Sequence, residues 1–398
     1  MANKNKLRVL HIATMDFTLK KMIADKMLEL KKYNYEIDLM SDDTGMVEDV
    51  KRMGFKHIKL KMSRRIHPLQ DLISILKLFK FLKSNHYDIV HTHTAKAGVI
   101  GRIAARLAGV KIVVHTSHGL PFYQGQPRMQ YQLYRMLEKT ASYFSDGYFS
   151  QNKEDIKHIK QMVPRRVLVG YEGNGIPLPK LDQYPKLSED QKEALKNELG
   201  IKDEEFVFIM AARFEPVKNH QMLFEALSRI QVKNLKVVLV GLDSQLEKIR
   251  DKAFELNVDQ YLLFLGYRDD IFDLIQISDA AILTSEKEGI PRFLMESMAF
   301  GKPVLATNVL GTKELVVHGE TGELVELNNY SQLAEHIEKW IKPEYKSILH
   351  RYGIKARMRI EQNFTEAIVA QRIHHFYEEL MSKVNGNKRA CMSLEKIV

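Results

Sequence analysis

The sequence predicts an α/β protein made of two parallel-sheet domains, and three observations support this fold class. The chain has 398 residues, more than one ordinary hydrophobic core accommodates. An apolar run at 7–13, a helical pattern at 22–32 and another apolar run at 35–40 follow the strand–helix–strand rhythm of a Rossmann half. A second series of this kind begins with the apolar run at 206–211. We therefore expect two Rossmann-like domains in sequence.

A proline-rich connection separates the two series. Pro177, Pro179 and Pro185 follow Gly175, and a helix is expected to start at Ser188. Thr365 can cap a last amphipathic helix. The expected division is 1–175 for the first domain, 176–364 for the second, 365–384 for the last helix and 385–398 for a flexible tail.

The composition is that of a soluble globular protein, with 45% hydrophobic and 28% charged residues. The single cysteine, Cys391, excludes internal disulfides and cysteine-based metal sites. No signal peptide is recognisable at the N-terminus, and no apolar stretch approaches the roughly 18 residues of a membrane-spanning helix. We expect a cytoplasmic location.

Positive charge is concentrated in the first half of the chain. Residues 1–180 carry a net charge of +15 (31 Lys and Arg against 16 Asp and Glu), and residues 181–398 carry −5 (29 against 34). Seven basic residues and no acidic one lie between Val50 and Gln70, ahead of the amphipathic segment 69–84. The basic loop suits an anionic membrane surface. For the segment 69–84, packing of its apolar side chains on the sheet is the favoured interpretation, with membrane contact as the alternative; these side chains are Leu72, Ile73, Leu76, Phe79 and Leu82.

The segment SEKEGIPRFLMESMAFGKP, at 285–303, predicts a loop that turns into a helix. Pro291 suits the first helical position, and Gly301 with Pro303 ends the helix. Glu288 then lies in the loop and Glu296 on the second turn, about 12 Å apart if the segment were helical throughout. They would lie on either side of a ligand, and the helix N-terminus between them favours phosphate. The spacing alone also fits two solvated glutamates.

A pair of cations follows the strand expected at 206–211. Arg213 and Lys218 lie at the mouth of this strand, just before a helix. Arginine binds a diphosphate with its fork of donors and lysine binds it as a point charge. The alternative interpretation is that the two cations are exposed loop residues without a ligand. Because Glu288 and Glu296 are also expected to border a ligand, we favour diphosphate binding by Arg213 and Lys218.

Histidines follow two strands of the first domain. His118 lies at the carboxyl end of a strand, where open α/β sheets bind ligands, with Gly119 beside it. His91 and His93 could suggest a metal, but we expect them to point to opposite faces of their strand, with no third ligand nearby. No metal site is therefore predicted.

These motifs together resemble the family-4 retaining glycosyltransferases, which have the GT-B fold of two Rossmann-like domains facing a central cleft. The resemblance rests on SEKEGIPRFLMESMAFGKPV, on the loop from Arg213 to Lys218 and on HTHTAKAG from His91, and it extends over most of the chain. It implies that the last helix crosses back to the first domain. Where many relatives have paired glycines, Thr14 to Thr18 follow the first strand. This loop is therefore expected either to bind with its side chains or to lie further from the ligand.

The resemblance also implies substrates. A UDP-sugar carrying a hexose or N-acetylhexosamine is the expected donor, and a lipid-linked saccharide or other oligosaccharide of bacterial exopolysaccharide or capsule synthesis is the expected acceptor. Neither a metal nor another cofactor is expected, nor is nucleic acid. The enzyme would work on the inner face of the plasma membrane, bound peripherally through its basic domain.

Residue roles follow from matching the motifs. We expect a catalytic set, a donor-binding set and an acceptor-binding set: His118, Arg213, Lys218 and Glu288 for catalysis; Gly289, Ile290, Pro291, Arg292, Phe293, Glu296, Tyr267 and Arg268 for the donor; Thr14, Asp16, His93 and Lys96 for the acceptor.

Other function classes stay open at this point. A nucleotide-sugar epimerase shares the two-Rossmann architecture and would need no acceptor. A transferase with a soluble acceptor would need no lipid. A basic RNA-binding module would need no donor, but the chain has no aromatic nucleic-acid motif of recognised spacing.

Overall fold

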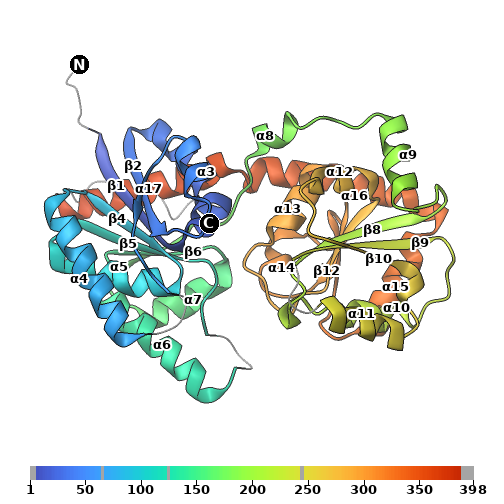
Figure 1. The fold of residues 1–398 in the computed structure, drawn as a ribbon, viewed down its shortest axis with the longest axis horizontal. Coiled ribbons are helices and arrows are strands. Elements are labelled where there is room, and N and C mark those ends of the chain that lie inside the picture. Colours follow the sequence, from blue (N-terminus) through green and yellow to red (C-terminus); the bar gives the residue numbers. More distant parts are fainter. Residues whose placement is uncertain (1–5, 64–66, 123–125, 243–245, 387–398) are drawn as a thin grey trace. The chain divides into compact units, whose positions relative to one another are not determined.

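The computed structural model describes residues 6–63, 67–122, 126–242 and 246–386. The chain divides into two compact units, one made of residues 1–175 with 366–398 and the other of residues 176–365. Each unit is an α/β layer structure with a single parallel sheet (Figure 1). This confirms the predicted fold class. Arg64 and Arg65, part of the basic segment between Val50 and Gln70, lie outside the described residues.

The sheet of the first unit has seven strands in the order β3-β2-β1-β4-β5-β6-β7. Its strands are β1 (Leu7–Met15), β2 (Tyr35–Asp42), β3 (Lys56–Lys59), β4 (Ile89–His93), β5 (Ile112–Ser117), β6 (Gly147–Ser150) and β7 (Leu168–Tyr171). Its helices are α1 (Asp16–Thr18), α2 (Ala24–Leu30), α3 (Val47–Arg52), α4 (Pro68–Ser84), α5 (Ala95–Ala108), α6 (Arg128–Ser142), α7 (Lys153–Met162) and α17 (Glu366–Val384), with a π-helical turn at Leu19–Ile23 and a 3-10 turn at Lys31–Tyr33.

Alternate side chains of these strands enter two separate cores. Val9 and Ile89 pack on the side of α2 and the last helix, α17, whereas Leu10 and Val90 pack on the side of α4 and α5. Successive strand residues point to opposite faces, so a sheet covered on both faces needs apolar residues throughout its strands. Figure 1 shows α17, in red, among the blue and green elements of the first unit.

Two local expectations for the first unit are wrong. The residues after the first strand form no loop, because Thr14 and Met15 continue β1 and Asp16 begins the helical segment. Helix α4 does not pack through Leu72, Ile73 and Leu76, which are all exposed. Of the other residues expected to pack, Leu82 is buried and Phe79 is partly buried against the core, and Leu78 joins them there.

The sheet of the second unit has six strands in the order β10-β9-β8-β11-β12-β13. Its strands are β8 (Phe206–Ala211), β9 (Leu235–Val240), β10 (Leu262–Gly266), β11 (Ala280–Leu283), β12 (Val304–Thr307) and β13 (Gly322–Val325). Its helices are α8 (Leu178–Asp182), α9 (Glu189–Glu198), α10 (His220–Leu227), α11 (Leu246–Glu255), α12 (Ile271–Ile277), α13 (Arg292–Ala299), α14 (Thr312–Leu315), α15 (Tyr330–Trp340) and α16 (Lys346–Asn363), with 3-10 turns at Pro216–Lys218, Asp259–Tyr261 and Pro343–Tyr345.

Local signals explain where two helices of this unit begin and end. Ser188 caps α9 through a capping box with Gln191, as the sequence predicts. Helix α13 ends at Ala299, and Gly301 follows with a φ of 73°, a left-handed conformation that glycine adopts without strain. Among the described residues, no helix combines the length and the apolar character that crossing a bilayer requires.

Candidate functional site

In the second unit, the loop between β11 and α13 has the predicted course. Helix α13 begins at Arg292, so Glu288 lies in the loop and Glu296 on the second turn. Pro291 is the N-cap residue rather than the first helical one, with φ −70° and ψ 114°. This shifts the helix start by one residue. Ile290 and Pro291 are buried, and Glu288 and Glu296 are partly exposed.

The loops after β8 and β11 meet at an ion pair. Lys218 Nζ lies 2.6 Å from Glu288 Oε1, which also accepts a hydrogen bond from Ser285 Oγ at 2.6 Å. The backbones are tied together as well, since Glu286 N donates to Val217 O at 2.9 Å. Adjacent parallel strands therefore bring together two predicted residues that are 70 positions apart in sequence.

The loop that follows β12 also contacts the backbone at Glu288. Glu288 N donates to Leu310 O at 3.2 Å. Gly311 has a φ of 87°, and a Cβ there would lie 1.7 Å from Gly289 O. Only glycine fits this contact, because any side chain would collide with backbone that cannot move cheaply. The position of the Glu288 backbone thus depends on the loop that follows β12.

The other predicted polar site residues of this unit form four further pairs. Arg292 Nε donates to Glu296 Oε1 at 2.8 Å on the first two turns of α13. Arg213 pairs with Glu215 at 2.6 Å, so the structure does not bring it to Lys218. The remaining two side chains follow the edge strand β10: Tyr267 hydroxyl donates to Asp269 at 2.7 Å, and Arg268 binds Asp270, lowering the pKa of that carboxyl. Phe293 packs on the hydrophobic core of this unit.

In the first unit, three neighbouring strands bring histidines into one hydrogen-bonded chain. His118 Nε2 lies 3.1 Å from His93 Nδ1, and His93 Nε2 lies 2.9 Å from His11 Nδ1. His11 is on β1, His93 ends β4 and His118 follows β5. We call these three residues the histidine chain. Its two outer nitrogens, His11 Nε2 and His118 Nδ1, are buried and have no hydrogen-bond partner among the described residues.

The histidine chain is electrically neutral near pH 7. Burial, reinforced by the nearby Lys26 ammonium, lowers the pKa of His11 to about 3 and that of His118 to about 4. Burial likewise holds the pKa of His93 well below its ordinary value. A neutral imidazole has one donor and one acceptor nitrogen. Each link therefore fixes the proton position of the next ring.

A second buried network adjoins the chain. His91 Nδ1 lies 2.6 Å from the Tyr377 hydroxyl on α17, and His91 Nε2 lies 2.7 Å from Thr116 Oγ1. Thr116 in turn donates to Glu172, whose other oxygen accepts from Lys26 Nζ at 2.5 Å. Neither Lys26 nor Glu172 is exposed to solvent. Lys26 of this pair supplies the positive charge that lowers the pKa of the histidines, whereas Glu172 acts in the opposite direction on His118.

The expectation about His91 and His93 is wrong. Residues two apart on a strand share a face, and their rings stack with centroids 4.5 Å apart. A third histidine, His11, lies opposite His91 on β1, and ring nitrogens of the three lie within 4.8 Å of one another. However, His11 Nδ1 and His93 Nε2 are only 2.9 Å apart, whereas two nitrogens on one tetrahedral zinc would be about 3.3 Å apart. The geometry fits hydrogen-bonded neutral imidazoles better than metal ligands.

The predicted acceptor residues are dispersed and engaged by the protein itself. His93 is fully buried inside the histidine chain, and Lys96 pairs with Asp71 at 2.7 Å. The Asp16 carboxylate is buried and accepts the Thr44 hydroxyl and the backbone N–H groups of Thr44 and Met46, the latter two each at 2.8 Å. These hydrogen bonds outweigh the effect of burial, which would raise the pKa of the carboxyl, and lower that pKa. Asp16 therefore holds the loop after β2.

Thr14 is the predicted acceptor residue that lies at the carboxyl edge of the sheet. Its hydroxyl is hydrogen-bonded to that of Thr94 at 2.8 Å. Thr94 has φ 64° and ψ 150°, a conformation that costs a β-branched residue on the order of 1–3 kcal/mol. Strained residues of this kind concentrate at functional sites. The Thr14–Thr94 pair, beside His118, is the part of this unit best suited to meet a ligand.

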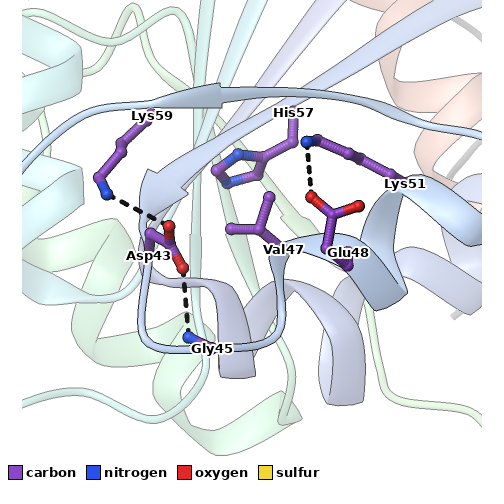
Figure 2. Close-up of a pocket in the computed structure, with 7 residues that line it drawn as sticks. All are labelled: Asp43, Gly45, Val47, Glu48, Lys51, His57 and Lys59. Atoms are coloured by element: carbon purple, nitrogen blue, oxygen red, sulfur yellow. Dashed lines mark hydrogen bonds and ion pairs between the residues drawn. The ribbon is translucent and has the colours of Figure 1, made fainter.

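A separate hollow of about 300 Å³ lies at the outer edge of the same sheet. Figure 2 shows that its charged side chains are already paired, Lys59 with Asp43 at 3.2 Å and Lys51 with Glu48 at 2.7 Å. Strand β3, helix α3 and the loop between β2 and α3 line it, whereas His118 follows β5. The sequence motifs do not converge on this hollow.

Sequence reasoning missed the residues that support His118. His11, Lys26, Glu172 and Tyr377 come from four elements spread over the chain. One signal was present, since His11 is a polar residue inside the apolar run of β1, where an unsatisfied imidazole would be costly. The hydrogen-bond partner of His11 could not be predicted from the residues of β1.

Comparison with known proteins gives a consistent result for both units. A family model described as "Glycosyl transferases group 1" matches residues 191–363, and one described as "Glycosyl transferase 4-like" matches residues 6–152. The "UDP-Gal:alpha-D-GlcNAc-diphosphoundecaprenol alpha-1,3-galactosyltransferase" of Escherichia coli is 29% identical over 387 residues, which cover 95% of this chain and 98% of the relative. The "Capsular polysaccharide biosynthesis glycosyltransferase CapM" of Staphylococcus aureus is 25% identical over 389 residues, covering 95% and 99%.

A solved structure shows the same architecture over nearly the full length. Anabaena Alr3699/HepE, solved in complex with UDP-glucose, superposes with a TM-score of 0.78 at 22% identity, covering 94% of this chain and 100% of that one. At this identity the similarity establishes the fold.

Proposed function

Because this chain belongs to the glycosyltransferases described by the group 1 and 4-like families, we propose that it transfers a hexose or N-acetylhexosamine from a UDP-sugar to a lipid-linked saccharide. The printed name of the Escherichia coli relative states a UDP-Gal donor and a diphosphoundecaprenol-linked acceptor. The Staphylococcus aureus relative is named for capsular polysaccharide synthesis. These names support a role in building a bacterial surface polysaccharide.

The observation that carries the proposal is the Lys218–Glu288–Ser285 cluster. The hard step of glycosyl transfer is the departure of a diphosphate, which gathers negative charge as the sugar becomes cationic. Lys218 lies at the carboxyl edge of the sheet, next to the N-terminus of α13. A diphosphate would draw the ammonium away from Glu288, and the freed carboxylate could then accept hydroxyl groups of the sugar.

The α13 helix provides the rest of the donor site. Its first N–H groups lack partners within the helix and favour phosphate oxygens. Glu296, now bonded to Arg292, would accept the ribose hydroxyls, while the backbone from Gly289 to Phe293 contacts the sugar. Arg213 is 59% exposed, and its side chain could leave Glu215 to join the diphosphate. Tyr267 and Arg268 would reach the base.

On the acceptor side, His118 would orient the sugar through hydrogen bonds, and the Thr14–Thr94 pair would meet the acceptor. Neutral His118 is suited to donate or accept a hydrogen bond rather than to carry charge. Transfer would retain the anomeric configuration by attack on the face from which the diphosphate leaves, with the donor phosphate taking the acceptor proton. The cations would replace a metal.

The test is transfer of radiolabelled sugar from UDP-, GDP- and ADP-sugars into bacterial lipid extracts. Label in the organic phase with one UDP-sugar only, and an anomeric proton coupling that matches the donor, would support the proposal. Label that stays in the aqueous phase with a soluble saccharide would refute the lipid acceptor. Formation of an epimer without any acceptor would refute transfer.

A further inference from the structure

We propose that the side chains of Gln151 and His118 together hold one oxygen atom of the saccharide substrate, so that Gln151 helps to select the sugar. This role rests on the proposed function and deepens it, because it assigns a residue through which the site distinguishes one saccharide from another. Both residues lie at the carboxyl edge of the first unit's sheet, and each has a buried nitrogen without a hydrogen-bond partner among the described residues.

Neighbouring strands place the two residues side by side. Ser117 on β5 pairs with Ser150 on β6, and His118 and Gln151 are the residues that follow them. The Gln151 N–H donates to Ser117 O at 3.3 Å, which continues the ladder past the strand ends. The Gln151 amide partly offsets the lowering of the His118 pKa by burial, so the two side chains are close, but it forms no hydrogen bond of good geometry with His118 Nδ1.

The Gln151 amide is buried and incompletely satisfied. The residue is 2% exposed, and its Nε2 has no partner among the described residues. The next residue shows that packing here can satisfy an amide, since Asn152 Oδ1 accepts from Asp155 N and Asn152 Nδ2 donates to Asp155 Oδ2, each at 2.8 Å. Buried polar groups nearly always have a partner. The partner missing at Gln151 is therefore expected to be a ligand.

The proton positions of the histidine chain make His118 Nδ1 a donor. With one proton on each neutral ring, the two links leave one outer nitrogen protonated and the other bare. A proton on His11 Nε2 would be stranded in the core, because His11 is fully buried, whereas His118 is partly exposed. A buried N–H group without an acceptor is rarer than a buried lone pair. The outer proton therefore lies on His118 Nδ1.

An oxygen atom satisfies this pair of donors. Gln151 Nε2 and His118 Nδ1 both donate, so neither nitrogen can be the partner of the other. A single hydroxyl or carbonyl oxygen has two lone pairs and can accept from both. Saccharides carry such oxygens around the ring. Open space lies beside His118 for this ligand, since a Cβ on Gly119 would meet no atom of the described residues within 4 Å.

The kinetic test combines Gln151→Met with substrate analogues that each lack one oxygen. Methionine keeps the length of the side chain and removes the amide. We expect Gln151→Met to lower kcat/KM for the natural sugar by about tenfold, and one analogue to lower kcat/KM of the unchanged enzyme by a similar factor. With that analogue, Gln151→Met should cost nothing more, because the contact is already lost. Separate series of donor and acceptor analogues identify which saccharide carries the oxygen.

Two further variants separate this role from a structural one. Gln161→Met changes an exposed glutamine on α7 of the same unit and should keep the unchanged kcat/KM. Gln151→Glu, assayed at pH 8, keeps a side-chain oxygen but loses the amide donors, and should be as slow as Gln151→Met. If Gln151 only accepts the His118 proton, Gln151→Glu will stay active and the loss in Gln151→Met will add to that of every analogue. This result would overturn the proposal. Circular dichroism verifies that the variants are folded.

A measurement without substrate tests the donor pair directly. In the spectrum of chain labelled with ¹⁵N-histidine, the signals that His118→Gln removes report which ring nitrogen of His118 carries the proton. We expect a protonated Nδ1, and a bare Nδ1 would overturn the proposal. This result does not depend on any donor or acceptor. Absence of transfer by the unchanged chain would instead refute the proposed function, so the two failures are distinguishable.

Discussion

The two units hold their candidate site residues in opposite ways. In the second unit, Lys218 and Glu288 are charged, partly exposed and paired with each other. In the first unit, His11 and His93 are fully buried and His118 is partly buried, and desolvation lowers the pKa of each. Both groups lie toward the carboxyl ends of parallel strands, where α/β sheets bind ligands.

The difference separates a site that can exchange partners from one that is fixed. The Lys218 and Glu288 side chains are 19% and 10% exposed, so a diphosphate can reach the ammonium and replace Glu288 as its partner. A buried polar chain is costly to disturb, because each imidazole left without its partner loses a hydrogen bond that water cannot replace. We therefore expect mutations in the second unit to act on catalysis and donor binding, and mutations in the histidine chain to act on stability as well.

The largest effect is expected from Lys218→Ala. Loss of the ammonium removes the charge that stabilises the departing diphosphate, and kcat should fall by about 10²–10³. The melting temperature should change little. Steady-state kinetics with the identified UDP-sugar provide the measurement, with Lys248→Ala as a control. A kcat within a factor of three of the unchanged enzyme would remove Lys218 from the mechanism.

Acidification is expected to destabilise the first unit. The pKa of His118 falls from 6.5 in the unfolded chain to about 4 in the folded protein, so the unfolded chain binds more protons as the pH drops below 6.5. The stabilisation that the neutral ring contributes to the folded protein is thus complete above pH 6.5. It is lost as the pH falls toward 4, and the loss amounts to a few kcal/mol. Chemical denaturation between pH 7.5 and 4.5 measures this loss.

His118→Gln should reduce the slope of that pH profile, because one of the histidines with a lowered pKa is removed, whereas His350→Gln, at an exposed histidine of the second unit, should leave it unchanged. A profile that keeps its slope in His118→Gln would assign the acid sensitivity to other groups.

His93→Leu breaks the middle of the histidine chain. It leaves His11 Nδ1 and His118 Nε2 without partners, which should lower the free energy of unfolding by about 2 kcal/mol. If the chain orients His118, kcat should also fall with KM for the donor unchanged. His93→Gln, which keeps a donor and an acceptor, should restore part of both. Lost stability with full activity would reduce the chain to a structural role.

The smallest effect is expected from Glu296→Ala. Loss of the carboxylate that we assign to the ribose should raise the Kd for the UDP-sugar about tenfold, equivalent to ~1.4 kcal/mol, with kcat largely kept. Isothermal titration with UDP and with the UDP-sugar measures the change, and Glu247→Ala on α11 is the exposed control. If UDP affinity does not change, the ribose assignment is wrong.

Much of the second unit could be read directly from the sequence. The turn from Glu288 into α13, the position of Glu296 on its second turn and the place of Lys218 after β8 depend on local signals such as Pro291 and Gly301. These signals act within a few residues, so a short window contains them. The sequence assigned Lys218 and Glu288 to the same ligand. The structure adds that their side chains form an ion pair.

In the first unit, local sequence signals predict the elements but not the contacts between them. The sequence by itself determined that β1, β4 and β5 are buried strands and that α4 is an amphipathic helix. Strand order decided that His11 meets His93, because their partnership spans 82 positions and no local pattern encodes it. Packing decided that Leu78 and Leu82 enter the core while Leu72 and Leu76 remain outside, because periodicity defines the sides of a helix but only its neighbours determine which side is buried.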